Sequence, residues 1–105
     1  LQVQLLETQT TDQDGRQEWW QNGQRHRAGD LPAVVHANGQ HEWWQNGKCH
    51  RDGDLPAVVT ANGQYQAWWQ NGYFHRAGDL PAIVCANGYQ EWWQNGKYQG
   101  PATRQ

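Results

Sequence analysis

The stretch EWWQNGKCHRDGDLPAVVTANG, from Glu42 to Gly63, decides the fold because near-copies of it fill most of the chain. Its tetrapeptide Trp-Trp-Gln-Asn recurs in steps of 24, 25 and 24 residues, at Trp19, Trp43, Trp68 and Trp92. A repeated step of this length is typical of arrays in which each unit packs on its neighbours. We therefore interpret the 105 residues as a single repeat domain with an N-terminal edge strand and cap (1–15), three full repeats (16–39, 40–63 and 64–88) and a partial C-terminal repeat (89–105).

Turn signals punctuate every unit. All seven Asn residues precede Gly, and Asn-Gly between alternating segments is the strongest short-range signal for a β-hairpin. The turns at Asn38-Gly39 and Asn46-Gly47 enclose six residues, which suit a strand and are too few for a stable helix. The sequence thus predicts an all-β fold: a tandem array of hairpins or meanders, built as a single extended sheet or a β-solenoid.

Two details refine this prediction. The step of 25 residues comes from one extra residue within the segment 64–67, which indicates a β-bulge. Residues 1–8 alternate apolar and polar side chains, which predicts an edge strand before the first unit. Asp14-Gly15 stands where later units carry Asn-Gly, so we expect a turn there.

Counting across two-residue turns assigns each Trp pair to two faces of the sheet. Trp43 is predicted to lie between Val34 and His50, and Trp44 between Ala33 and Cys49. The first Trp faces His in every full unit, which indicates a repeated interior. We assign packing roles to Trp19, Trp43, Trp68, Trp92, His26, His50 and His75.

The second Trp of each pair has a different cross-strand partner in each unit, which indicates a surface or an adaptable contact. These partners are Arg25, Cys49, Phe74 and Tyr98. The predicted contact face therefore consists of Trp20, Trp44, Trp69, Trp93, Arg25, Phe74 and Tyr98.

Composition excludes several classes of function. The net charge of -2 lacks the basic footprint of a nucleic-acid or membrane-surface protein. The longest apolar runs have four residues, too short for a transmembrane helix. No signal peptide is visible and the first residue is not Met, so a processed product or a fragment is expected, and the localisation stays open. The 8 Trp stand beside only 14 Leu, Ile, Val and Phe, so the buried mass must be largely aromatic.

Metal binding and catalysis find little support in the residue pattern. His36 and His41 are expected to face each other across their turn with His50 on the same face, but no zinc-type spacing is present. The repeated His residues are better explained by packing on Trp and hydrogen bonding to a carbonyl or carboxylate of the link. Ser is absent, and Cys49 and Cys85 occupy non-equivalent positions, so we predict no enzyme, no cofactor and free thiols in preference to a bridge.

The repeated charged residues suggest local pairs. Arg27 and Arg51 are predicted to pair across strands with Glu18 and Glu42. Arg76 faces Ala67 instead, so it is predicted either to pair with Asp79 or to meet a ligand. Side chains that cap turns explain the Asp residues of the links, Asp30, Asp54 and Asp79.

The unit Trp-Trp-x-Asn-Gly-x-x-His-Arg-x-Gly-Asp-Leu-Pro-Ala, followed by a strand and a second Asn-Gly, resembles the MORN-variant repeats. These repeats occur in bacteria, in large DNA viruses and in some bacterial antitoxin or immunity proteins. The resemblance covers residues 14–102 and implies a β-hairpin array used for protein contacts or scaffolding. A looser resemblance is to choline- and glucan-binding cell-wall repeats, which also carry aromatic pairs beside Asn-Gly hairpins.

The sequence therefore predicts a non-enzymatic repeat module for protein–protein interaction, scaffolding or self-assembly. The partner is a protein or a second copy of the chain, because a repeating glycan would favour identical subsites over the varied contact face. A carbohydrate- or cell-wall-binding module that uses exposed Trp residues is the alternative. An immunity or antitoxin protein is a second alternative, which the resemblance alone suggests. Neither nucleic acid nor membrane is expected as a partner.

Overall fold

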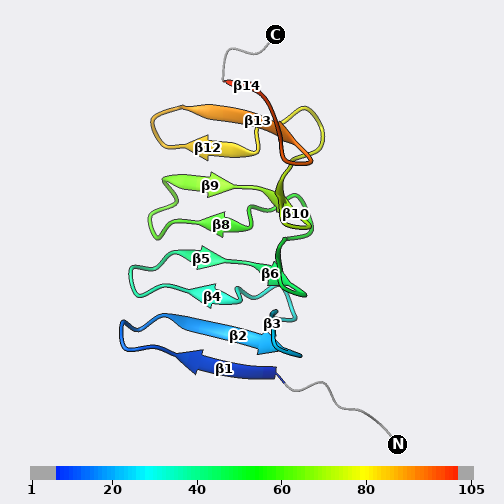
Figure 1. The fold of residues 1–105 in the computed structure, drawn as a ribbon. Coiled ribbons are helices and arrows are strands. Elements are labelled where there is room, and N and C mark those ends of the chain that lie inside the picture. The colour runs from blue at the N-terminus through cyan, green and yellow to red at the C-terminus, as the bar shows by residue number, and fades with distance from the viewer. Residues whose placement is uncertain (1–6, 102–105) are drawn as a thin grey trace, which may run out of the picture.

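The computed structural model describes residues 7–101, in which antiparallel strands and turns occur without any helix (Figure 1). The all-β prediction is confirmed. Ten strands form one sheet, in the order β1-β2-β4-β5-β8-β9-β12-β13-β14, with β3 paired to the far part of β2. These strands are β1 (Glu7–Thr11), β2 (Gln17–Gln21), β3 (Gln24–Arg25), β4 (Val34–Val35), β5 (His41–Glu42), β8 (Val58–Val59), β9 (Tyr65–Ala67), β12 (Ile83–Cys85), β13 (Gln90–Gln94) and β14 (Lys97–Pro101).

Two small ribbons lie beside the sheet, where the second and third sequence units leave it (Figure 1). They are β6 (Trp44–Gln45) with β7 (Lys48–Cys49), and β10 (Trp69–Gln70) with β11 (Tyr73–Phe74). The single strand expected over residues 40–45 is therefore split between two sheets. The division falls at Trp43, whose backbone N–H still donates to the carbonyl oxygen of Ala57, directly before β8, at 2.7 Å.

The edge strand β1 begins in the segment predicted to be one. Most of the predicted strand over residues 1–8 lies outside the described residues. The turn expected at Asp14-Gly15 is present, because Gly15 donates to the Asp12 carbonyl at 3.1 Å and connects β1 to β2.

The Asn-Gly turns fall into two structural types. In the Trp-Trp-Gln-Asn-Gly hairpins both turn residues have positive φ, as at Asn46 (51°) and Gly47 (80°), which is a two-residue type I′ turn. These turns confirm the predicted pairing of Trp44 with Cys49, and the equivalent pairs in the other units. In the Ala-Asn-Gly turns only Gly has positive φ, and the loop has three residues at Asn38-Gly39 and Asn87-Gly88 and four at Asn62-Gly63.

This second type makes the predicted register across Asn38-Gly39 wrong by one residue. His36 donates to Gln40, so Val34 pairs with Glu42 and not with Trp43. The physical reason is that a type I turn followed by a left-handed Gly closes a three-residue loop, which suits the same dipeptide. The prediction that His36 and His41 face each other fails for the same reason, because His41 pairs with Val35.

The bulge predicted for residues 64–67 is also wrong. Thr60 donates to Tyr65 across a loop of four residues, so the extra residue enlarges the turn and leaves β9 regular. A register shift does occur at Trp92/Trp93, where β13 pairs with β14.

The core is built from small aliphatic residues beneath indole rings. The Ala that follows each link Pro is fully buried, as is Ala67, and Val34 and Ile83 are buried beside them. Trp43 and Trp68 are buried above this layer. Successive units lie one above another along the long axis (Figure 1), and the molecule measures 55 × 33 × 19 Å. Its radius of gyration of 15.2 Å exceeds the value of about 13 Å for a compact chain of this length.

Candidate functional site

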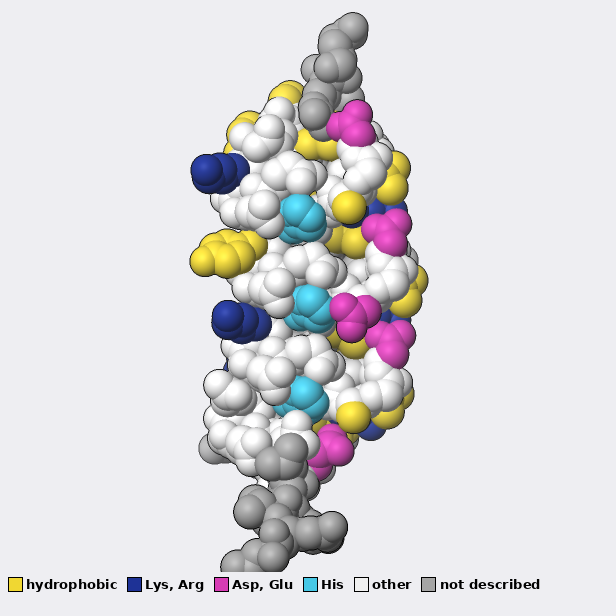
Figure 2. All heavy atoms as spheres, turned by 90° about the vertical axis from the view of Figure 1, so that its right-hand side faces the viewer, with side chains coloured by type: hydrophobic (Ala, Val, Ile, Leu, Met, Phe, Trp, Pro, Cys, Tyr) yellow, Lys and Arg dark blue, Asp and Glu magenta, His cyan; other side chains and the backbone are white. Residues whose placement is uncertain are grey.

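A row of hollows runs along the side of the molecule that Figure 2 shows, where three His side chains form a column beside a column of acidic side chains. Each hollow lies where the Gly-Asp-Leu-Pro link of one unit meets the Trp-bearing hairpin of the next. We call these the link hollows. The middle one has a volume of about 540 Å³ and is bounded by Asp30, Trp43, Gln45, Arg51 and Leu55.

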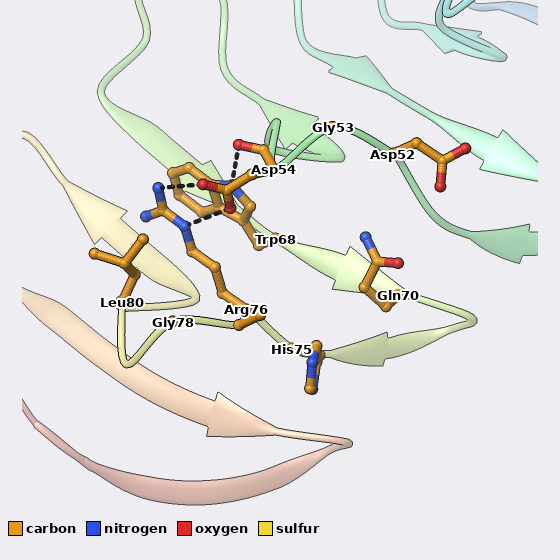
Figure 3. A pocket seen from close by; sticks show the side chains of 10 residues that line it. Asp52, Gly53, Asp54, Trp68, Gln70, His75, Arg76, Gly78 and Leu80 are labelled. Atoms are coloured by element: carbon orange, nitrogen blue, oxygen red, sulfur yellow. Dashed lines mark hydrogen bonds and ion pairs between the residues drawn. The ribbon is translucent and has the colours of Figure 1, made fainter.

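The upper link hollow is the same structure one unit further along (Figure 3). Its volume is about 480 Å³, and Asp54, Trp68, Gln70, Arg76 and Leu80 take the equivalent positions. A third hollow of about 380 Å³ lies below, with Trp19, Arg27 and Leu31 in these positions. There β1 replaces the link of a preceding unit. Trp, Arg and Leu are thus presented at three successive heights, and the link Asp and the Gln at the upper two.

A Trp–Arg–Asp cluster forms the inner wall of both the middle and the upper link hollow. The Arg76 guanidinium carbon lies 3.8 Å from the centroid of the Trp68 ring, and Arg76 Nε donates to Asp54 Oδ1 at 3.0 Å (Figure 3). Trp68 Nε1 donates to the Asp54 carbonyl oxygen at 3.1 Å. Arg51, Trp43 and Asp30 repeat this arrangement one unit earlier.

The predicted pairs of Arg27 with Glu18 and Arg51 with Glu42 are therefore wrong. The ribbon strand β7 ends at Cys49, so Arg51 lies beyond the ladder and turns back to the preceding link. The pairing of Arg76 with Asp79 or a ligand is likewise replaced by Asp54. Each link Asp has positive φ, and the carboxylates of Asp30 and Asp54 reach the Arg of the next unit.

Glu18 and Glu42 bind other partners. Glu18 accepts from Arg16 at 2.6 Å and from Arg25 at 2.7 Å. Burial alone would raise the pKa of Glu18, but the hydrogen bonds from these two guanidinium groups lower it below its usual value. Glu42 accepts from His36 and from the indole of Trp44.

The repeated His residues join consecutive units. Asn46, Asn71 and Asn95 donate their backbone N–H groups to the Nδ1 atoms of His26, His50 and His75, at 3.0 to 3.1 Å. Because Nδ1 accepts, the neutral ring carries its proton on Nε2. His50 Nε2 contacts Asp52 Oδ1 at 2.8 Å, so the predicted link carboxylate is a partner of this His. His26 and His75 border the link hollows.

The first Trp of each pair differs in burial between the middle and the end units. Trp43 and Trp68 are buried, whereas Trp19 and Trp92, in the end units, are partly exposed. Their His partners lie across the hairpin as predicted, because His26, His50 and His75 donate their backbone N–H groups to Trp19, Trp43 and Trp68.

The predicted contact face is a continuous row of rings and spacers along the molecule. Trp69 and Trp93 pack on opposite sides of Phe74, with ring centroids 4.0 and 5.0 Å from it. Arg25 lies in the same way between Trp20 and Trp44, at 5.6 and 5.0 Å. The varied partners therefore fill the gaps between hairpins, and all four second Trp residues are only partly exposed.

The ends of this row differ from its middle. Tyr98 follows Trp93 with its ring centroid 5.3 Å away and is 52% exposed. Cys49, which packs against Trp44 and Trp69, is buried, and burial raises the pKa of its thiol to about 12. Both cysteines are free thiols.

Residues 7–101 bring together no group of three or more His, Cys, Asp or Glu side chains that could hold a metal ion. The same residues include no helix with the length and apolar character needed to cross a membrane.

Comparison with known proteins identifies no family for this chain: no family model, no curated protein and no solved structure matches it. The resemblance to MORN-variant repeats therefore stays a prediction.

The link hollows are the feature that sequence reasoning missed. Their signal is the identical Gly-Asp-Leu-Pro link, in which turn capping explains only the Asp residue. Each segment exposes one Leu at the rim of a hollow: Leu31 (47%), Leu55 (41%) and Leu80 (41%).

Proposed function

We propose that the chain is a tandem array of β-hairpin repeats that acts as a non-enzymatic protein-interaction module. The His, Arg, Trp and Gln side chains that recur in the units are engaged in holding one unit to the next. For example, Gln45, Gln70 and Gln94 donate to the carbonyl oxygens of Arg27, Arg51 and Arg76 at 2.7 to 3.0 Å. These contacts support a rigid scaffold that presents the same surface several times.

The observation that carries the proposal is the recurrence of the link hollow with its exposed Leu. Exposed aliphatic side chains are unremarkable singly, but an ordered series beside concave surface is typical of an interaction site. The three Leu residues occupy equivalent positions in consecutive units and expose nearly equal fractions of their surface. A partner that lies along the molecule would contact all of them at once.

The carbohydrate alternative draws less support from this geometry. Sugar rings stack on free indole faces, but Trp43 and Trp68 are buried beneath Arg51 and Arg76. In the row of second Trp residues, the indoles pack against neighbouring side chains such as Arg25 and Phe74. The immunity or antitoxin alternative continues to rest on the resemblance alone.

Self-assembly is a second candidate, which one observation favours. Every residue of the edge strand β1 is exposed, and an unpaired strand edge is a template for pairing with another chain. Light scattering after size exclusion, at protein concentrations from micromolar to millimolar, tests this candidate. A mass that stays at 12.1 kDa throughout would contradict it.

The interaction proposal is tested by selecting a displayed random-peptide library on the wild-type protein and on the L31N/L55N/L80N variant. We expect enriched peptides whose affinity falls by about tenfold or more with the variant. The matched control is Y73N/Y89N, which removes two other exposed apolar side chains and should leave binding unchanged. Circular dichroism verifies that both variants fold. Failure to enrich any peptide that depends on the Leu residues would overturn the proposal.

A further inference from the structure

We propose that the link hollows bind one peptide in the polyproline II conformation, which lies along the row and seats the side chain of every third residue in a hollow. This inference rests on the proposed function and names the partner's conformation and chemistry. Three features of the row carry it: its spacing, its hydrogen-bonding groups and its charge.

The spacing of the hollows follows from the sheet. Each unit contributes two neighbouring strands, such as β4 and β5 followed by β8 and β9. Strands lie about 4.7–4.9 Å apart, so equivalent points recur about every 9.4–9.8 Å. A polyproline II helix has three residues per turn and rises about 3.1 Å per residue, so its side chains recur on one side about every 9.3 Å.

Other peptide conformations fit the row less well. In an extended strand, residues three apart point to opposite sides, so an odd period cannot serve successive hollows. Two turns of an α-helix span about 10.8 Å and would drift by about 1 Å at each hollow. Of these conformations, only polyproline II repeats its side chains on one side of the peptide at the spacing of the hollows.

The hydrogen-bonding groups of the hollows match a backbone of this kind. A polyproline II backbone makes no internal hydrogen bonds, so its carbonyl groups need donors from solvent or partner. His75, whose Nδ1 accepts from Asn95, carries its proton on Nε2 at the upper hollow. Gln70 donates Nε2–H to Arg51, which leaves Oε1 as an acceptor for a peptide N–H. At the middle hollow Gln45 takes the position of Gln70, and His50, with Nε2 at 2.8 Å from Asp52 Oδ1, takes that of His75. His26, whose Nδ1 accepts from Asn46, also borders this hollow.

The charge of the row predicts the residues between the seated ones. Asp30 and Asp54 line the hollows but are paired with Arg51 and Arg76, so the inner wall is close to neutral. Asp52 borders both upper hollows with a side chain that is 90% exposed. An acidic peptide would be repelled there, whereas Lys or Arg between the seated positions would be attracted. Leu at the seated position complements the Leu and Trp side chains of each hollow.

The test uses a fluorescein-labelled peptide of twelve residues with the repeat Leu-Pro-Lys, titrated with the whole protein and followed by fluorescence anisotropy. A peptide of the same composition with its Leu residues out of the three-residue period is the control. We expect the periodic peptide to bind about tenfold more tightly or better. The L55N/L80N variant should lower its affinity by a similar factor, and Y73N/Y89N should not.

The remaining outcomes separate this inference from the proposed function. Equal affinity for the periodic and aperiodic peptides overturns the polyproline II inference. Library-selected peptides without the three-residue period that still depend on Leu55 and Leu80 would do the same, and would leave the interaction function standing. Binding of cello- or chito-oligosaccharides at the row, with no peptide bound, would overturn both.

Discussion

Glu42 links the sheet to the row of second Trp residues through a dense set of hydrogen bonds. Its carboxylate accepts from His36 Nε2 at 2.8 Å, from Trp44 Nε1 at 2.9 Å and from the Gln40 side chain at 3.2 Å. Glu91 accepts the indole N–H of Trp93 in the same way at 2.7 Å. The indole therefore has a carboxylate partner in two units. The predicted pairs of Glu with Arg do not include this arrangement, because they follow from counting positions in an ideal strand ladder.

The pH dependence of stability reports on Glu42. Burial alone would raise its pKa, but the hydrogen bonds from His36, Trp44 and Gln40 lower it below the ordinary value of 4.5. A carboxyl with a depressed pKa stabilises the fold above its unfolded pKa, and this stability is lost as the pH falls through the folded pKa. We expect the free energy of unfolding to fall below about pH 4.5, and less steeply in E42Q.

Urea unfolding at pH 7 and pH 3 measures this effect. At pH 7 we expect E42Q to cost about 1.5–3 kcal/mol, the range for hydrogen bonds to a charged group, since the Glu42 side chain is only 18% exposed. The control is E7Q on the exposed strand β1, which should change little. Parallel pH profiles for E42Q and the wild type would contradict the role assigned to this carboxylate.

At the scale of the element, one dipeptide forms two different turns. After Trp-Trp-Gln it forms a type I′ turn. After Ala it forms a loop of three or four residues in which Asn Oδ1 accepts a backbone N–H, as Asn38 does from Gln40 at 3.0 Å. The loops also differ in their neighbours. A Cβ on Gly39 would lie 2.6 Å from Ala61 Cβ, whereas a Cβ on Gly63 would meet nothing within 4 Å.

These two glycines form a matched pair for mutagenesis. Both G39A and G63A place a side chain at positive φ, with a strain of about 1–2 kcal/mol. Only G39A adds overpacking, so we expect it to be less stable than G63A by about 1–3 kcal/mol in urea unfolding. The G39A/A61G double variant should recover most of this difference. Equal losses for G39A and G63A would rule out the contact between consecutive loops.

The turns also show which parts of the fold are predictable from the sequence. The pairing of each Trp with its hairpin partner was predicted because a type I′ turn fixes the register within eight residues. The Ala-Asn-Gly register failed because the same dipeptide closes loops of two, three or four residues, and the dipeptide alone does not distinguish them. The identical Gly-Asp-Leu-Pro segments do not by themselves predict the link hollows, because each hollow joins a link to the hairpin of the next unit. Such a contact depends on how units stack.

At the scale of the whole molecule, the contacts that cross each junction are equivalent. Gly47, Gly72 and Gly96 donate their backbone N–H groups to Arg25, Cys49 and Phe74, each at 2.9 Å. Because each junction uses the same groups, a unit can be removed if both new neighbours retain them. The order of the units then matters less than their register.

Deletion of residues 43–67 tests this independence. It joins Glu42 to Trp68 and brings His26 opposite the N–H of Asn71, which restores the bond that Asn46 makes in the intact chain. We expect a folded β protein whose urea m-value is lower by about a quarter, since about a quarter of the chain is removed. Deletion of residues 43–54 removes half a unit and should abolish the fold. Circular dichroism distinguishes the two deletion variants. Loss of β structure in both would contradict the equivalence of the junctions between units.

The row of rings from Trp20 to Tyr98 has an optical consequence. Phe74 separates Trp69 from Trp93 with centroid distances of only 4.0 and 5.0 Å, and Arg25 separates Trp20 from Trp44 just as closely. Two indoles that both pack on one intervening side chain are close enough to exchange excitation energy before they emit. Light absorbed by one ring therefore leaves from another with a different orientation, and the emission is depolarised even while the molecule is stationary. The protein's own fluorescence thus reports the state of the whole column of chromophores at once.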